Sequence, residues 1–218
     1  IAAFGIDTVS RRIYTIHFKN LETGEMCTET ISGCAGGGAW AKDNKTFFYI
    51  SKDLETLRTN RILRHELGTD VASDVQIFKE EDETFTCYTW KTKSKNLIMI
   101  GSFQTVSSEF QMLDAGNPTG DFTMIQERER DHEYSVSHFE NKLYITTNWE
   151  AKNFRLMETT VDTPGKENWK EVIAHREETL LEGVEIFQNH MVVNERNGGL
   201  SQLRIINHET GDEHYLDF

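Results

Sequence analysis

The sequence predicts an all-β protein in which four-stranded antiparallel units repeat along 218 residues. Two sets of sequence landmarks share one period, and each period holds four short runs rich in Val, Ile, Phe, Tyr and Thr. Gly, Asn, Asp and Lys bound these runs, which is typical of strands and turns rather than of helices. Four strands per period of about 45 residues indicate the blades of a β-propeller.

The first set of landmarks consists of five turn-like tetrapeptides, each of which follows an apolar run. They are LETG, HELG, LDAG, DTPG and HETG, and they end at Gly24, Gly68, Gly116, Gly165 and Gly211, at intervals of 44, 48, 49 and 46 residues. The second set is a polar turn before an apolar run, and its positions Lys45, Asn96, Lys142 and His190 are 51, 46 and 48 residues apart. Because both sets share one period, chance is a poor explanation for the repeat.

The predicted strands follow in chain order as four complete groups. They lie at 37–42, 46–51, 60–67 and 74–80; at 85–90, 97–103, 108–113 and 122–127; at 134–139, 143–148, 154–159 and 170–175; and at 184–188, 191–195, 201–206 and 213–218. Runs at 1–7, 11–18 and 25–31 precede them, and we interpret these as the last three strands of a blade whose innermost strand is missing. A barrel or a sandwich would supply strands without repeating them in fours.

The predicted organisation is therefore a single partial β-propeller domain over 1–218. Its blades span 1–33 in part, then 34–83, 84–131, 132–178 and 179–218, and almost no helix is expected. The chain begins at Ile1, inside a strand-like run and without an initiator Met, so we expect a piece of a longer protein. Open strand edges seek partners, so edge-to-edge self-association of the fragment is also expected.

Composition narrows the classes of partner. The chain has 36 acidic residues against 23 Lys and Arg, for a net charge of −13, which disfavours nucleic acid and anionic membranes. No apolar run approaches the roughly 18 residues of a membrane span. The three cysteines, Cys27, Cys34 and Cys87, lack CxxC spacing, so we expect free thiols in a reducing, cytoplasmic compartment.

Acidic residues recur where the outermost strand of one predicted blade passes to the innermost strand of the next. These junctions read KEEDETF (79–85), RDHEYS (130–135) and HREETLLEG (175–183). We predict an arc of negative charge formed by Glu80, Glu81, Asp82, Glu83, Asp131, Glu133, Glu177, Glu178 and Glu182. The alternative is an ordinary solvated loop surface, because charged turns usually are no more than that.

The segment RDHEYS places His132 between Asp131 and Glu133, with Tyr134 beside them. In an extended strand, adjacent side chains point to opposite faces, so these residues cannot converge on one substrate atom. We therefore predict a docking or filtering role rather than catalysis. We also expect the two flanking acids to favour the protonated form of His132.

Other motifs give no active site. The pattern Gly-x-Ser-x-Gly is absent, Val136 stands four residues after His132 where a zinc protease motif would need a second His, and CAGGGAW (34–40) lacks the Gly-Lys-Ser/Thr of a phosphate loop. We interpret CAGGGAW as a flexible loop that enters an inner strand. No catalytic residue, metal site or cofactor is expected in this chain.

Four segments resemble a known family over essentially the whole chain. SRRIYTIHFKNLETGE (10–25), RDHEYS, KNFRL (152–156) and LLEGVEIFQNHMVVNERNGGLSQLRIIN (180–207) are similar to the propeller of oligopeptidase B enzymes, also called protease II. These enzymes belong to the prolyl oligopeptidase family of serine peptidases. The resemblance implies a seven-bladed propeller, of which this chain is the central stretch.

The resemblance also implies a partner and an activity. In that family an α/β-hydrolase domain after the propeller carries the Ser, Asp and His catalytic residues and cleaves short peptides after Arg or Lys. The propeller covers the active site and excludes large folded proteins. This chain matches the propeller and lacks the catalytic motif, so it should be inactive alone. A freestanding binding module is the alternative, and a propeller glycosidase that uses paired carboxylates is a further one.

Overall fold

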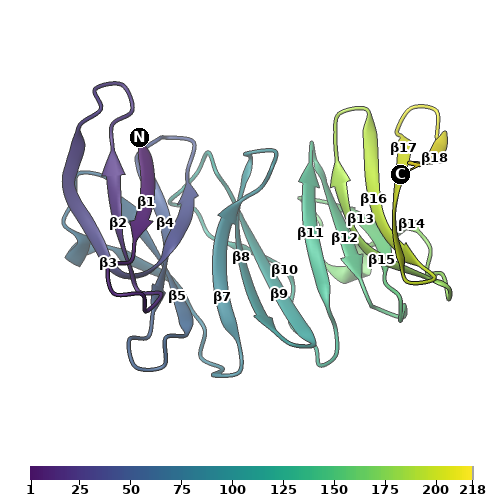
Figure 1. Cartoon of the computed structure of the whole chain (residues 1–218), viewed down its shortest axis with the longest axis horizontal. Coiled ribbons are helices and arrows are strands. Elements are labelled where there is room, and N and C mark those ends of the chain that lie inside the picture. The colour runs from purple at the N-terminus through teal and green to yellow at the C-terminus, as the bar shows by residue number, and fades with distance from the viewer. Residues whose placement is uncertain (218) are drawn as a thin grey trace. The chain divides into compact units, whose positions relative to one another are not determined.

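The computed structural model describes residues 1–217 and confirms the all-β prediction (Figure 1). Its strands lie in four sheets, one of six strands and three of four strands. Within residues 1–217 the only helical segments are two single turns of three residues each, η1 (Val71–Ser73) and η2 (Lys166–Asn168). No helix in this part of the chain is long and apolar enough to cross a membrane.

The first sheet contains the predicted partial blade and the first complete blade. In sheet order its strands are β1 (Ala2–Ile6), β2 (Tyr14–Lys19), β3 (Met26–Trp40), β4 (Thr46–Lys52), β5 (Thr59–Glu66) and β6 (Val75–Lys79). Strand β3 is 15 residues long and serves two partners. Its first half pairs with β2, where Ile16 faces Ile31, and its second half pairs with β4, where Ala39 faces Phe48. The two predicted blades are therefore joined through one strand.

The glycine-rich stretch CAGGGAW lies inside β3, so the expectation of a flexible loop was wrong. The register against β4 shifts between Cys34 and Gly38, which marks a β-bulge. Gly36 has φ of +83° at this bulge, a backbone conformation that L side chains rarely adopt. The glycines therefore accommodate the place where β3 passes from one partner strand to the other.

The other three sheets correspond to the remaining predicted blades. They contain β7 (Thr86–Lys91), β8 (Leu97–Gln104), β9 (Ser107–Asp114) and β10 (Thr123–Gln126); β11 (Tyr134–Phe139), β12 (Lys142–Thr147), β13 (Arg155–Thr160) and β14 (Lys170–Ile173); and β15 (Thr179–Ile186), β16 (His190–Asn197), β17 (Leu200–Asn207) and β18 (Glu213–Tyr215). Neighbours in the chain are neighbours in each sheet. The last predicted strand extended to Phe218, which lies outside the described residues.

Strand β15 begins at Thr179, five residues before the predicted start at Val184. The register of β15 against β16 shifts between Leu181 and Gly183. Gly183 therefore belongs to a bulge inside the strand, whereas the sequence analysis made it the last residue of the acidic junction 175–183. As a consequence, Glu182 lies within β15 and not in the junction.

The two sets of sequence landmarks are hydrogen-bonded to each other in every complete repeat. The turn before the outermost strand donates a backbone N–H to a carbonyl of the turn after the innermost strand: Leu67 to Lys45 at 2.9 Å, Ala115 to Asn96 at 2.8 Å, Val161 to Asn141 at 3.2 Å and His208 to Asn189 at 3.0 Å. These turns thus share one end of each sheet. The acidic junctions lie at the opposite end.

The described chain forms two compact units, one of residues 1–104 with 111–123 and the other of residues 105–110 with 124–218. In the first unit, Ile50 and Ile62 of the first sheet belong to one buried cluster with Ile100 of the second sheet. In the second unit, Leu156 of the third sheet clusters with Val193 of the fourth. Apolar side chains between adjacent sheets therefore form the core of each unit, as in stacked sheets generally.

Candidate functional site

The first junction, residues 79–85, is held by an arginine from the β4–β5 turn. The guanidinium of Arg58 donates to the carbonyl oxygens of Phe85 at 2.9 Å and Glu80 at 3.3 Å, and also to that of Asp82. Three backbone acceptors on one guanidinium group define the path of the junction. Side-chain directions within the junction therefore depend on a residue more than twenty positions earlier in the sequence.

The four acids of the first junction point in different directions. Glu80 is 3% exposed, accepts a hydrogen bond from the Ser102 hydroxyl and accepts the N–H of Asp82 at 2.9 Å. Asp82 accepts both the N–H and the hydroxyl of Thr84, at 2.9 and 2.7 Å. Glu81 is 76% exposed and lies 2.9 Å from Lys79, and Glu83 is exposed too. Glu80 therefore belongs to the interior, and Glu81 and Glu83 belong to the surface.

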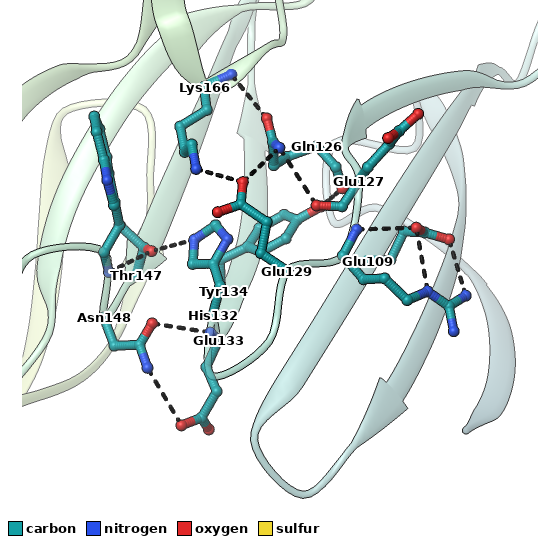
Figure 2. Close-up of polar contacts among 12 residues, drawn as sticks. Glu109, Gln126, Glu127, Glu129, His132, Glu133, Tyr134, Thr147, Asn148 and Lys166 are labelled. Carbon is teal, nitrogen blue, oxygen red and sulfur yellow. Dashed lines mark hydrogen bonds and ion pairs between the residues drawn. The ribbon is translucent and has the colours of Figure 1, made fainter. Parts of the chain in front are cut away.

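The second junction contains RDHEYS, and its first half is a turn rather than an extended strand. Asp131 has φ of +61°, and its side chain is 71% exposed beside Arg130, which is 93% exposed. Asn148 anchors the turn, because its amide N–H donates to the Asp131 carbonyl at 3.0 Å. The amide oxygen of Asn148 accepts the Glu133 N–H at 2.9 Å (Figure 2). The turn directs Asp131 to solvent and His132 to the interior.

His132 is 5% exposed, and its Nε2 lies 3.0 Å from the Thr147 hydroxyl (Figure 2). Its other ring nitrogen, Nδ1, is buried without a hydrogen-bond partner. Burial lowers the pKa of His132, the nearby Lys166 ammonium lowers it further, and the Glu129 carboxylate opposes both effects. The expectation that Asp131 and Glu133 favour protonation was therefore wrong, because the ring turns away from them into an apolar setting.

Tyr134 joins β11 to the preceding segments. Its hydroxyl donates to the Gln126 carbonyl and accepts the Phe110 N–H at 2.9 Å. Its backbone N–H donates to the Ser108 hydroxyl at 2.8 Å, and that hydroxyl donates to the Tyr134 carbonyl at 2.9 Å. Burial raises the pKa of the phenol, and Tyr134 is 4% exposed, so it is a neutral group in the interior.

A cation lies beside His132 and completes the second junction. Lys166 forms an ion pair with Glu129, whose other contact is a 3.1 Å hydrogen bond from the Gln126 amide (Figure 2). The hydrogen bond from Lys166 is the largest cause of the lowered pKa of Glu129. The Lys166 ammonium also lies 5.4 Å from the ring centroid of Trp149. The Lys166 ammonium thus offsets the negative charge of Glu129. Asp131 is the junction acid that faces outward.

The third junction is anchored in the same way as the second. The Asn153 amide, from the β12–β13 turn, donates to the carbonyls of Arg176 at 3.1 Å and Glu177 at 2.6 Å. The Glu177 side chain is 81% exposed, and Glu178 is exposed as well. Glu182 instead accepts a 2.7 Å hydrogen bond from Arg196 on β16. The three junctions therefore each present at least one carboxylate to solvent.

Several structurally important residues had no distinctive signal in the sequence. Arg58, Asn148 and Asn153 anchor the junctions, yet single polar residues in turns are common and carry no such information. No group of three or more His, Cys, Asp or Glu side chains within residues 1–217 could hold a metal ion.

Comparison with known proteins places the chain in a family. The family model described as "Prolyl oligopeptidase, N-terminal beta-propeller domain" matches residues 1–218. The chain is 38% identical to "Dipeptidyl aminopeptidase BI" of Pseudoxanthomonas mexicana over 94% of this chain and 28% of that protein. It is 33% identical to "Protease 2" of Moraxella lacunata over 88% of this chain and 28% of that protein.

A solved structure supports the same assignment. Oligopeptidase B from Leishmania major matches with a TM-score of 0.90 and 26% identity, over 99% of this chain and 32% of that one. The chain therefore spans less than a third of the length of these relatives. On the family match, the strand repeat and the four sheets, this chain belongs to the prolyl oligopeptidase family, within its N-terminal β-propeller domain.

Proposed function

We propose that this chain is the non-catalytic propeller of a serine oligopeptidase that cleaves short peptides after Arg or Lys. Its partner is an α/β-hydrolase domain of the same protein, and the propeller restricts access to the active site. The names of two proteins similar to this chain, "Protease 2" and oligopeptidase B, support this proposal. In this proposal residues 1–218 are one continuous part of the propeller, with blades at 1–33, 34–83, 84–131, 132–178 and 179–218.

The acidic junctions help to select basic peptides in this proposal. The observation that carries it is the outward direction of one or more carboxylates at every described junction. These carboxylates belong to Glu81, Glu83, Asp131, Glu177 and Glu178. Exposed carboxylates of one sign attract cationic substrates and raise their rate of encounter, which salt screens. Glu80 and Glu133 make contacts at their own junctions, and Glu182 lies in β15, so these three acids are secondary to this role.

The cytoplasmic location expected from the cysteines is also part of the proposal. Cys27, Cys34 and Cys87 are free thiols. Burial raises the pKa of both Cys34 and Cys87 to about 12, so these thiols remain protonated and unreactive at neutral pH.

The test uses the full-length protein with all five outward acids changed to amides. We expect kcat/KM for an Arg-containing peptide to fall roughly 3- to 10-fold at low salt and to change little at high salt. The value of kcat should be largely preserved, because the acids act on encounter and not on bond cleavage.

A matched variant changes five exposed acids at the opposite end of the sheets, Glu22, Glu25, Asp121, Glu140 and Glu209, so that the net charge is the same. It should keep the salt dependence of the unaltered enzyme. Equal effects in both variants would show that only net charge matters. An unchanged salt dependence with lower thermal stability would show that the junction acids are ordinary surface charge.

A further inference from the structure

A chain of polar side chains crosses the first sheet at a position remote from the acidic junctions. His65 on β5 is 0% exposed, and each of its ring nitrogens faces a carboxylate. Nδ1 lies 2.7 Å from Asp74, just after η1, and Nε2 lies 3.2 Å from Glu29 on β3. The Phe18 ring stacks on the imidazole with centroids 5.8 Å apart. The imidazole therefore has two acidic neighbours and an apolar cover.

The other contacts of the two carboxylates determine how many protons this cluster needs. Asp74 accepts a hydrogen bond from the Tyr49 hydroxyl at 2.9 Å through its second oxygen. Glu29 accepts the Gly68 N–H at 2.7 Å through the same oxygen that faces His65. An ionised carboxylate can only accept, and a neutral imidazole donates from one nitrogen alone. With both carboxylates ionised and the ring neutral, one of the two contacts would lack a hydrogen.

We propose that His65, Glu29 and Asp74 together hold one proton more than a neutral imidazole and two carboxylates, and that this proton closes a pH-sensitive tie across the first sheet. The tie connects the half of β3 that pairs with β2 to β5 and to the turn at Gly68. Loss of the proton at alkaline pH leaves a carboxylate facing a bare ring nitrogen. The Glu29 contact then opens, and the Gly68 turn is released.

The remaining groups around the cluster do not replace this proton. Burial raises the pKa of the Cys34 thiol to about 12 and that of the Tyr49 phenol even higher, with the Asp74 charge contributing to both, so both groups stay neutral. Arg61 on β5 acts on the Tyr49 phenol, and no hydrogen bond joins it to either carboxylate. The extra proton therefore supplies the positive charge that offsets the Glu29 and Asp74 carboxylates beside His65.

One substitution should keep the contact between His65 and Glu29 while removing the need for the extra proton. In Asp74→Asn the side-chain amide N–H donates to a neutral Nδ1 and its carbonyl accepts the Tyr49 hydroxyl, because two different Asp74 oxygens make these contacts. The Nε2–H can then donate to Glu29, and no extra proton is needed. In the full-length protein, hydrogen–deuterium exchange of the segment around Gly68 is measured between about pH 6 and about pH 9 and corrected for intrinsic rates. We expect unaltered protein to lose protection about tenfold per pH unit once the proton leaves. Asp74→Asn should keep its protection.

The control is Glu25→Gln, at an exposed acid immediately before β3, which should behave like the unaltered protein. A second measurement needs no folded variant of Asp74: histidine-selective 15N labelling reports whether both ring nitrogens of His65 carry hydrogen near neutral pH, with His65→Gln used to assign the signal. A bare ring nitrogen at neutral pH with Glu29 and Asp74 both ionised would overturn the proposal. Protection at Gly68 that does not change with pH in the unaltered protein would overturn it too.

Discussion

The imidazole of His132 stacks on the phenol ring of Tyr134, with ring centroids 5.2 Å apart and an angle of 23° between the planes. Trp169 approaches both rings, at 6.1 and 5.7 Å between centroids. This aromatic cluster explains why a histidine flanked by two acids in the sequence lies in an environment that disfavours its charged form. The cluster leads directly to two predictions.

The first prediction concerns acid stability. Because burial lowers the pKa of folded His132 below its unfolded value of about 6.5, the unfolded chain binds a proton that the folded chain does not. The resulting stability is present above that unfolded pKa and is lost as pH falls below it. We therefore expect His132→Gln to lose less unfolding free energy than the unaltered protein between about pH 7.5 and about pH 5.5, measured by urea titration. The exposed His190→Gln should show no such difference.

The second prediction concerns the hydroxyl of Tyr134. Tyr134→Phe removes the buried hydroxyl that accepts the Phe110 N–H and donates to the Gln126 carbonyl. An unsatisfied buried group costs about 1–3 kcal/mol, so the free energy of unfolding should fall by that amount. Tyr88→Phe, at a side chain that is 43% exposed, should stay within about 0.5 kcal/mol of the unaltered protein in the same urea titration. Equal effects of the two changes would contradict a special role for Tyr134.

The third prediction concerns a buried ion network in the last sheet. Glu195 is 0% exposed and binds Arg204 at 2.6 Å, Tyr215 at 3.1 Å and also Arg176. Glu195→Gln removes the buried charge between Arg204 and Arg176 and leaves Arg204 with Glu213, 2.9 Å away, as its remaining carboxylate partner. We expect a loss of up to about 3 kcal/mol of unfolding free energy. The exposed Glu209→Gln is the control. A loss below about 0.5 kcal/mol would mean that water compensates the arginines.

The fourth prediction compares adjacent glycines of β3. A Cβ atom on Gly38 would lie 2.2 Å from the Phe48 carbonyl oxygen and 2.5 Å from the Phe47 ring, whereas a Cβ on Gly37 would meet nothing within 4 Å. Gly38→Ala should therefore lower the free energy of unfolding by about 1–3 kcal/mol or more, because strand pairing must shift. Gly37→Ala should be close to neutral by thermal or urea unfolding. If both substitutions were equally tolerated, the close approach of β3 to β4 would be wrong.

The sequence by itself determined the strand repeat. Period-2 runs and glycine-marked turns are local properties, so β11 was predicted at the residues where it is found, 134–139. The same local evidence misled where a glycine sits inside a strand. The sequence analysis placed Gly183 in a junction and CAGGGAW in a loop, but both lie at bulges inside strands. A bulge depends on the register of the partner strand, which neighbouring residues in the sequence do not reveal.

The tertiary structure alone decided which way each junction side chain points. Glu80 and Glu81 are adjacent acids with the same chemistry, and only the position of Ser102 on another strand places Glu80 inside. His132 is buried because Asn148 holds the turn around Asp131, and its pKa follows from burial and from Lys166, 34 positions later in the chain. Periodicity is encoded in neighbouring residues, whereas burial and charge environment depend on partners that only folding brings together.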